Sequence, residues 1–298
     1  MHHVTICICT YKRPALLKAL LGQLGTQESG GLFTISIVVV DNDSQRSAQG
    51  VVKEFAESAS VPVKYCVESR QNIALARNKA VANAEGDYVA FIDDDEFLTC
   101  STWLRTLFTA VSTYKADGAC GPVKPHFEDG TPRWVVEGRF YDRPSYRTGL
   151  VIDWRKGRTG NTLLSKQALL SCGEPFRPQF RTGEDQDLFR RLIEKGYVFI
   201  WCHEAMAYET VPPCRWKRTF LLRRALLRGA TFRHHATFGA RHVLNSVVAI
   251  PAYVVALPFA LILGQGRFMF LLVKLCDHLG RLLALAGVNP IRNQYVTE

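Results

Sequence analysis

Short apolar runs alternate with amphipathic segments along the first part of the chain. The runs are rich in Val, Ile and Cys, as strands are, and an unbroken run such as 35–40 is typical of a parallel strand covered on both faces. Strands are predicted at 4–9, 35–40, 63–67, 88–92, 119–123 and 162–165, and helices at 14–24, 48–59, 73–84 and 102–114. Asn72 is expected to cap the third of these helices. This order predicts an α/β fold, an open and mainly parallel sheet with helices on both faces.

The C-terminal part of the chain has a different pattern. Residues 243–263 are uncharged and long enough for one membrane span, which takes about 20 residues, although Pro251 and Pro258 interrupt them. A second helix is predicted at 268–286. Four polar residues lie on one face of this helix: Lys274, Asp277, His278 and Arg281. This pattern indicates that the helix lies in the membrane interface. The pattern leaves open whether residues 243–263 span the bilayer or enter it as a kinked hairpin.

The net charge of +10 is concentrated in this same part of the chain. No Asp or Glu occurs between Thr210 and Cys276, where ten Lys and Arg residues lie, so the rest of the chain carries as many acidic as basic residues. A segment that is both basic and apolar favours an anionic membrane surface or a lipid phosphate over nucleic acid. We therefore predict an α/β domain at 1–213 and a helical membrane-association region at 214–298, with a soluble helical cap as the alternative.

Nine cysteines are scattered singly, without a Cys-x-x-Cys pair. This spacing argues against a zinc ribbon and a thioredoxin motif, and unpaired cysteines are typical of a reducing compartment. A strand is predicted almost at the first residue, so no signal peptide is expected. Because positive charges flank the apolar run, we expect the α/β domain on the cytoplasmic face of the inner membrane.

Four acidic residues, Asp93, Asp94, Asp95 and Glu96, follow the apolar strand at 88–92. Carboxylates this close repel one another in a low-dielectric site, and a divalent cation with oxygen ligands is the simplest compensation. A solvated acidic turn is the alternative interpretation. In open parallel sheets, ligands bind beyond the carboxyl ends of the strands, which is where these four residues are predicted to lie.

Two other predicted strands also end in polar residues. Thr10-Tyr11-Lys12-Arg13 follows the first strand, and Asp41-Asn42-Asp43 follows the second. These residues are expected at one edge of the sheet with the four acids. Neither Gly-x-Gly-x-x-Gly nor a Walker A loop occurs, which disfavours dinucleotide binding and P-loop phosphoryl transfer. Residues 126–158 are rich in Trp, Tyr and Arg, and they are expected either to contact a sugar or an acceptor or to form a surface loop.

A second acidic group, Glu184, Asp185 and Asp187, precedes an amphipathic helix that ends at Gly196. One interpretation is structural, since acids stabilise a helix N-terminus and Thr182 with Asp185 matches a capping box. The other interpretation is chemical, since a carboxylate that is ionised at neutral pH can accept the proton of a hydroxyl group.

Five motifs, in this order, resemble those of the family 2 glycosyltransferases, which have the GT-A fold. They are Thr10-Tyr11-Lys12-Arg13-Pro14, Asp41-Asn42-Asp43, Ala76-Arg77-Asn78, Phe91-Ile92-Asp93-Asp94-Asp95 and Gly183-Glu184-Asp185-Gln186-Asp187-Leu188. Five motifs in order are more specific than any one of them. Within the family, the chain looks most like bacterial exopolysaccharide transferases of the succinoglycan glucosyltransferase type. This finer likeness rests on 157–161, Val211-Pro212-Pro213 and Arg224-x-x-x-Arg228-Gly229.

The resemblance implies a role for each of these residues. Asp95 would ligate Mg²⁺ or Mn²⁺, Asp185 would be the general base, and Glu184 would contact the acceptor. Asp93 would face the ribose or the donor sugar. The residues expected in the donor site are Thr10, Tyr11, Arg13, Asp41, Arg77, Asp93, Asp94, Arg224 and Arg228.

Within that site the resemblance assigns the uridine and its phosphates to Tyr11, Asp41 and Arg77. One departure from the family pattern concerns the metal. Related sequences often have a metal-binding His where this chain has Thr210, and the nearby His203 is expected at a strand end, not at the metal. The metal would then be held by Asp95, the donor diphosphate and water only.

The resemblance implies an inverting, metal-dependent and membrane-associated glycosyltransferase. It would move a sugar from a nucleotide-sugar donor, with UDP-glucose the first expectation, to a lipid-linked oligosaccharide in bacterial polysaccharide synthesis. The alternatives are another nucleotide sugar, a polyprenyl-phosphate acceptor, or a catalytically inactive GT-A-like scaffold subunit. No nucleic-acid partner is expected.

Overall fold

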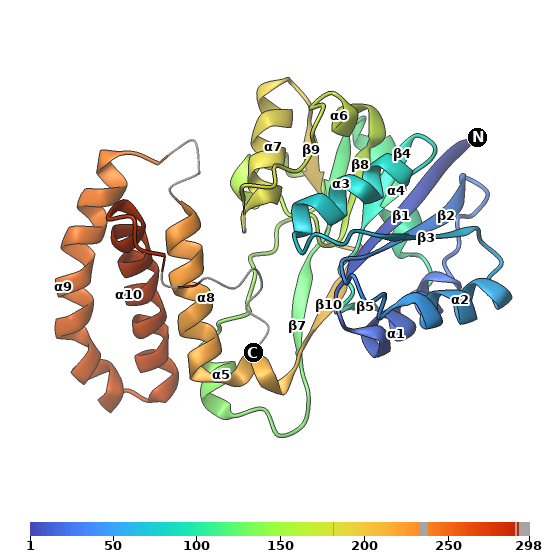
Figure 1. The fold of residues 1–298 in the computed structure, drawn as a ribbon. Coiled ribbons are helices and arrows are strands. Elements are labelled where there is room, and N and C mark those ends of the chain that lie inside the picture. The colour runs from blue at the N-terminus through green and yellow to red at the C-terminus, as the bar shows by residue number, and fades with distance from the viewer. Residues whose placement is uncertain (181, 233–237, 290, 292–298) are drawn as a thin grey trace. The chain divides into compact units, whose positions relative to one another are not determined.

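Seven strands form one sheet in the order β3-β2-β1-β4-β8-β6-β9 (Figure 1). The computed structural model describes residues 1–180, 182–232, 238–289 and 291. The strands β1 to β4 run parallel, while β8 is antiparallel to both β4 and β6, so the predicted α/β fold with a mainly parallel sheet is confirmed. The bounds are β1 (His2–Thr10), β2 (Phe33–Asp41), β3 (Val63–Val67), β4 (Tyr88–Phe91), β6 (Gly118–Cys120), β8 (Thr162–Ser165) and β9 (Phe199–Trp201).

Helices cover both faces of this sheet, because its strands are apolar on both sides. Ile6 and Ile8 pack into one buried cluster with residues of α1 (Pro14–Leu24), α2 (Gln49–Ser58) and α4 (Trp103–Tyr114). Cys7 packs on the other face with residues of α3 (Ile73–Asn83), α6 (Lys166–Leu170) and α7 (Glu184–Glu194). The Asn72 side chain accepts the backbone N–H groups of Ala74 and Leu75, so the predicted cap of α3 is confirmed.

The strand predicted at 119–123 is divided between two sheets. It ends as β6 before Gly121, and β7 (Val123–Phe127) starts a smaller sheet with the order β5-β10-β7. At the break, Gly121 lies so close to the backbone of Ala205 that no Cβ would fit, and Pro122 has no N–H to continue the ladder. The other two strands of this sheet are β5 (Glu96–Leu98) and β10 (Ala207–Val211).

The chain divides into two compact units. The catalytic-motif unit comprises Met1–Lys124 and Arg143–Glu209, and the helical unit comprises Pro125–Asp142 and Thr210–Glu298. The boundary predicted after residue 213 differs from this division, because Pro125–Asp142 folds with the C-terminal residues. Its apolar residues explain this: Val135 and Tyr141 pack in one cluster with residues of the C-terminal helices.

Three long helices build most of the helical unit: α8 (Arg218–Thr231), α9 (Ala240–Ile262) and α10 (Gln265–Leu285). Helix α10 packs against both α8 and α9. Gly229 and Gly280 allow the close crossing of α8 and α10, since a Cβ at either position would lie within 2.3 Å of a backbone oxygen of the other helix. Asp277 of α10 is buried, and Arg228 of α8 donates hydrogen bonds to it. The sequence predicted that the polar face containing Asp277 lies in a membrane interface, but Asp277 faces α8.

Helix α9 runs without a break through Pro251 and Pro258. In the part of the chain that the structure describes, it is the one helix long and apolar enough to cross a membrane, with a mean hydropathy of 1.9 over its most apolar 18 residues. Only 11% of those residues are buried in the protein. Its apolar side chains therefore have little cover from the rest of the chain.

Candidate active site

The carboxyl ends of β1 and β4 bring four predicted site residues together. The Thr10 hydroxyl donates to Asp94 Oδ2 at 2.8 Å, and Arg13 Nη1 donates to Asp94 Oδ1 and to Asp95 Oδ2, each at 3.0 Å. The parallel pairing of β1 with β4 places the two strand ends side by side. Asp94 and Asp95 are buried there, so the acidic run is not a solvated turn.

Arg77 connects this strand edge to the second acidic group. It lies on α3 and is 7% exposed, its Nη2 donates to Asp93 Oδ1 at 3.3 Å, and its Nη1 is bonded to Glu184 at the start of α7. Burial alone would lower the pKa of Arg77, but attraction to Glu184 and then Asp93 raises it above its ordinary value. Arg77 is therefore a fixed cation between two carboxyl groups, while its contact with the donor phosphates stays a prediction.

The start of α7 is set by a glycine and not by the predicted capping box. Gly183 is the residue before the helix and has φ of +85°, a conformation that glycine adopts without strain, and no side chain caps the helix. The capping-box interpretation of Thr182 and Asp185 is therefore wrong. Instead Asp185 Oδ1 accepts the backbone N–H of Gln186 at 2.8 Å.

The three acids of this helix have different environments. Glu184 is buried against Arg77, and Asp187 is buried and accepts a bond from Arg191 Nε at 2.9 Å. Asp185 is half-buried and forms no ion pair with any residue that the structure describes. It is therefore the acid of this group that is available to a bound hydroxyl group.

A further charged group lies beside the strand edge and joins Glu96 of the acidic run to two residues that the sequence did not assign to the site, Glu209 and Arg143. Glu96 and Glu209 face each other in the antiparallel pair of β5 and β10, and both are buried. Arg143 is bonded to Glu209 and lies 3.9 Å from Glu96 Oε1, while Glu96 Oε2 accepts the backbone N–H of Asp93 at 3.2 Å. A partial sequence signal existed, since Glu96 continues the acidic run and Glu209 lies inside the strand β10, but their common arginine comes from an irregular segment.

Burial raises the pKa of several carboxyl groups in this site. Desolvation outweighs the neighbouring arginines and raises the pKa of Asp94 and of Glu184 to about 7. Desolvation is also the main reason that the pKa of Asp93 is raised and that the pKa of Glu96 is raised well above its ordinary value. Repulsion among the carboxyl groups adds to these shifts, so the site holds more potential negative charge than its arginines neutralise.

The residues present fit a divalent cation. The side chains beyond the strand ends offer carboxylate oxygens, which are the ligands that Mg²⁺ and Mn²⁺ prefer, and their excess negative charge would be reduced by such an ion. Within the described ranges, no three His, Cys, Asp or Glu side chains are arranged to hold a metal ion on their own. His203 is exposed and contacts the Ser145 hydroxyl at 3.0 Å. Coordination by Asp95, a diphosphate and water stays a prediction.

The remaining predicted donor residues differ in their surroundings. Asp41 is fully buried, and its carboxylate accepts bonds from the Ala48 N–H and the Tyr65 hydroxyl, both at 2.8 Å, so it fixes the loop after β2. Tyr11 is half-buried, with the Lys12 ammonium 5.3 Å from the centre of its ring.

Arg224 and Arg228 belong to α8 of the helical unit, and both are exposed. Arg228 Nε and Nη2 donate to the two carboxylate oxygens of Asp277 at 2.8 and 2.6 Å. The charge of Arg228 is thus already matched within its own unit, and the predicted contact of both arginines with the donor is not tested by this geometry.

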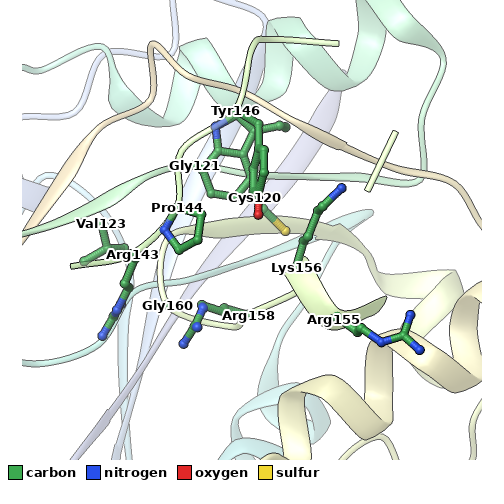
Figure 2. Close-up of a pocket in the computed structure, with 11 residues that line it drawn as sticks. Cys120, Gly121, Val123, Arg143, Pro144, Tyr146, Arg155, Lys156, Arg158 and Gly160 are labelled. Atoms are coloured by element: carbon green, nitrogen blue, oxygen red, sulfur yellow. The ribbon is translucent and has the colours of Figure 1, made fainter. Parts of the chain in front are cut away.

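A cavity of about 50 Å³ opens in the catalytic-motif unit (Figure 2). Its lining comprises residues at the ends of β6 and β9, Val123 of β7, and residues of the segments 143–146 and 155–160. Four of the lining side chains are cationic: Arg143, Arg155, Lys156 and Arg158. The irregular region that the sequence assigned either to an acceptor contact or to a surface loop therefore contributes one wall of a cavity.

Comparisons with known proteins agree with this arrangement. Residues 5–173 match the model of glycosyl transferase family 2. The succinoglycan biosynthesis protein ExoM of Rhizobium meliloti is 32% identical to this chain over 77% of the chain and 74% of that protein. The mannosyltransferase PcManGT from Pyrobaculum calidifontis, solved with GDP-Man and Mn2+, has a TM-score of 0.67 at 17% identity and covers 96% of this chain and 88% of its own. S. aureus TarS 1-349, solved with UDP, has a TM-score of 0.53 at 15% identity. The match covers 97% of this chain and 93% of the TarS chain. At these identities the two structures show a common fold.

Proposed function

This chain belongs to glycosyltransferase family 2 and has a GT-A fold, and we propose that it is an inverting, metal-dependent transferase of bacterial exopolysaccharide synthesis. The proposed donor is UDP-glucose and the proposed acceptor is a lipid-linked oligosaccharide. The observation that carries the proposal is the contact of Arg77 with both Asp93 and Glu184, which joins the acidic strand edge to the start of α7. The pathway is supported by the likeness to the succinoglycan biosynthesis protein of Rhizobium meliloti.

The donor half of the mechanism depends on charge. A divalent cation held by Asp95, when bound, would neutralise the diphosphate as it leaves. Arg13 holds Asp95 and Asp94 in place through bonds of 3.0 Å, and Arg77 places Asp93 toward the ribose or the donor sugar. These arginines fix the positions of the carboxylates before the donor binds, which avoids reorganisation during the reaction.

The acceptor half requires one base. Asp185 takes the proton of the acceptor hydroxyl, whose oxygen forms a bond to the anomeric carbon while the bond from that carbon to the diphosphate oxygen breaks. The bonding electrons leave with the nucleoside diphosphate, and a single displacement inverts the carbon. Glu184, fixed by Arg77, contacts the acceptor. Help from a general base typically accelerates such a step by about 10²–10⁴-fold.

The helical unit supports a membrane location. Val255, Phe259 and Ile262 of α9 are more than 60% exposed, which is costly in water and favourable in lipid. The ten basic residues between Thr210 and Cys276 would add attraction to an anionic surface, at about 1 kcal/mol each near the surface. We therefore propose a location at the cytoplasmic face of the cell membrane, with the acceptor drawn from the same membrane.

A calorimetric screen of UDP- and GDP-sugars with Mg²⁺ or Mn²⁺ tests the donor assignment, and Asp95→Ala tests the metal. We expect the variant to lose at least about tenfold in metal-dependent UDP affinity, because the cation loses its protein ligand. The control is Asp87→Ala, at the opposite end of β4, where the side chain is half exposed and binds His2 and His3 of the first strand. UDP affinity in Mn²⁺ within twofold of the wild type would show that Asp95 is not the ligand.

The second candidate function is a catalytically inactive scaffold subunit. A turnover assay distinguishes the scaffold from the transferase. Only the transferase is expected to release sugar from UDP-glucose in a reaction that requires Mn²⁺ and Asp185. A scaffold has no need for buried carboxyl groups with raised pKa values, which favours the enzyme.

A further inference from the structure

Two buried glutamates of the catalytic-motif unit face each other across the small sheet. Glu96 of β5 and Glu209 of β10 are direct partners in the antiparallel pair, and they are 2% and 6% exposed. Like charges in such opposition destabilise a sheet. The Arg143 side chain compensates them, since it is bonded to Glu209 and its Nη1 lies 3.9 Å from Glu96 Oε1. One arginine therefore serves two carboxylates.

Glu96 also closes the turn that carries the acidic run. Its Oε2 accepts the backbone N–H of Asp93 at 3.2 Å, and its own backbone N–H donates to the Asp93 carbonyl at 3.0 Å. Asp94 and Asp95 are the two residues between these bonds. The directions in which the Asp94 and Asp95 side chains leave the turn therefore depend on where the Glu96 carboxylate is held.

A glycine packs against the same carboxylate. A Cβ on Gly160 would lie 2.5 Å from Glu96 Oε1 and 3.0 Å from Asp93 Oδ2, so a glycine lets the chain approach both groups. The next residue is fixed, because Asn161 is fully buried and its side-chain amide is bonded to Trp103 Nε1 and to two backbone carbonyls. Glu96 therefore has no room to move toward Gly160.

The remaining oxygen of Glu96 depends on Arg143. Glu96 Oε1 is buried and accepts no hydrogen bond within the described residues, so its compensation is the Arg143 charge. Burial would lower the pKa of Arg143, but attraction to Glu209, and then to Glu96, Asp93 and Asp95, raises it. Without this cation, Glu96 and Glu209 would repel each other across β5 and β10, and Glu96 would move together with the turn that it closes.

We propose that Arg143 is a positioning residue, which acts through Glu96 on the turn 93–96 and thereby places Asp95 for the metal and the donor diphosphate. This assignment rests on the proposed transferase function. A carboxylate that is already in place binds its ligand without the cost of being ordered. Arg143 lies outside the five motifs. It is the first residue of the second segment of the catalytic-motif unit, and Glu209 is the last, so their ion pair joins the two ends of that segment.

The test measures UDP affinity in Mn²⁺ by calorimetry, with the full-length protein. Arg143→Ala should lower this affinity by at least about tenfold, because Asp95 is no longer held in place. In an Asp95→Ala background, the same substitution should change UDP affinity by less than about twofold, since a residue that acts through Asp95 then has no further effect. A merely structural role of Arg143 would give additive losses in this double-mutant cycle.

Three variants make the outcome specific. Arg143→Ala combined with Glu209→Gln removes one of the two repelling charges, and it should recover most of the lost UDP affinity. Arg139→Ala removes a guanidinium that is 78% exposed and paired with Asp142, and it should leave UDP affinity unchanged. If Arg143→Ala does not fold, Arg143→Lys takes its place in the cycle. It keeps the charge but not the planar fork, so the same pattern is expected with a smaller loss.

A second measurement does not depend on UDP. Hydrogen–deuterium exchange of the free protein reports on the Asp93 amide, which Glu96 protects. Arg143→Ala should speed exchange in the segment 93–96 by about tenfold, the loss of one hydrogen bond, and leave exchange in β2 unchanged.

The proposal is overturned if protection at 93–96 is unchanged in Arg143→Ala, if UDP affinity is unchanged, or if the losses in the cycle are additive. A wild-type chain that binds no UDP, with a turn that nevertheless loosens in Arg143→Ala, would contradict the proposed function and keep the link from Arg143 to the turn.

Discussion

The two units of this protein place charged and apolar side chains in opposite ways. The catalytic-motif unit buries Asp94, Asp95 and Glu96 at 5%, 7% and 2% exposure, next to arginines that only partly neutralise them. The helical unit buries Asp277 with one matching arginine and leaves α9 uncovered, with Ile262 at 84% exposure. Each unit therefore has one feature that costs free energy in an isolated, water-soluble protein.

The difference indicates what each unit is for. Buried carboxyl groups without full compensation destabilise a fold, and the proposed cation would offset this cost by supplying the missing positive charge. An exposed apolar helix destabilises a protein in water, and the proposed contact with a membrane would remove this cost. A matched pair such as Arg228 with Asp277 requires neither. The cost of the buried carboxyl groups and the cost of the exposed apolar helix can be measured separately, because substitutions in one unit should not alter the other cost.

The largest expected effect is on catalysis. Asp185→Asn should lower kcat by about 10²–10⁴-fold and leave donor affinity unchanged, because the base acts in the transition state and not in donor binding. Steady-state kinetics together with UDP calorimetry measure the two quantities. Gln186→Ala changes the next residue on the same helix and serves as the control. A variant that keeps more than about a tenth of kcat would show Asp185 to be structural.

Next in size is the effect of breaking the central ion pair. Arg77→Leu should lower the free energy of unfolding by about 3–5 kcal/mol, because it leaves Glu184 and Asp93 without their cation in a buried site. Chemical denaturation measures this. The matched comparison is Arg228→Leu in the helical unit, where the arginine side chain is 52% exposed and the loss should be smaller. Equal losses in the two variants would contradict the contrast between the units.

The third effect concerns membranes. Val254→Lys with Phe259→Lys should release the protein from anionic vesicles in high salt, since a Lys deep in a bilayer costs about 2.5–3.5 kcal/mol. Both positions are exposed, so the fold and UDP binding should be unaffected. Co-sedimentation is the measurement, and Lys53→Glu controls for charge on the other unit. If the wild-type protein stays in solution without detergent as a monomer, the membrane assignment is wrong.

The fourth effect is a dependence of stability on pH. Burial raises the pKa of Asp94 to about 7, above the value of about 4 in an unfolded chain. Between these values the folded state binds more protons, so stability should fall as pH rises from about 4 to 7 and then level off. Asp94→Asn should flatten this slope, which thermal unfolding across the range measures. An unchanged slope would show that Asp94 is ionised in the folded protein throughout.

The sequence by itself determined the elements of the catalytic-motif unit. Helix 14–24 and strands 63–67 and 162–165 were predicted with the bounds that the structure has, because apolar periodicity, Pro14 and the flanking turns are local signals. The clustering of Thr10 and Arg13 with the acids after β4 followed from the rule that parallel strands end at one edge. The Asn72 cap followed from local hydrogen bonding.

Tertiary structure alone decided which charges meet. Arg77 and Glu184 are 107 positions apart, and Arg143 and Glu209 are 66 apart, so no local pattern links them. It also decided that α10 turns Asp277 toward α8, since the Gly229 and Gly280 crossing sets the rotation of that helix. Periodicity reports which face of an element is apolar. It does not report which neighbour covers that face, because the neighbour is usually a segment distant in the chain. Which segments pack together depends on the free energy of the whole fold.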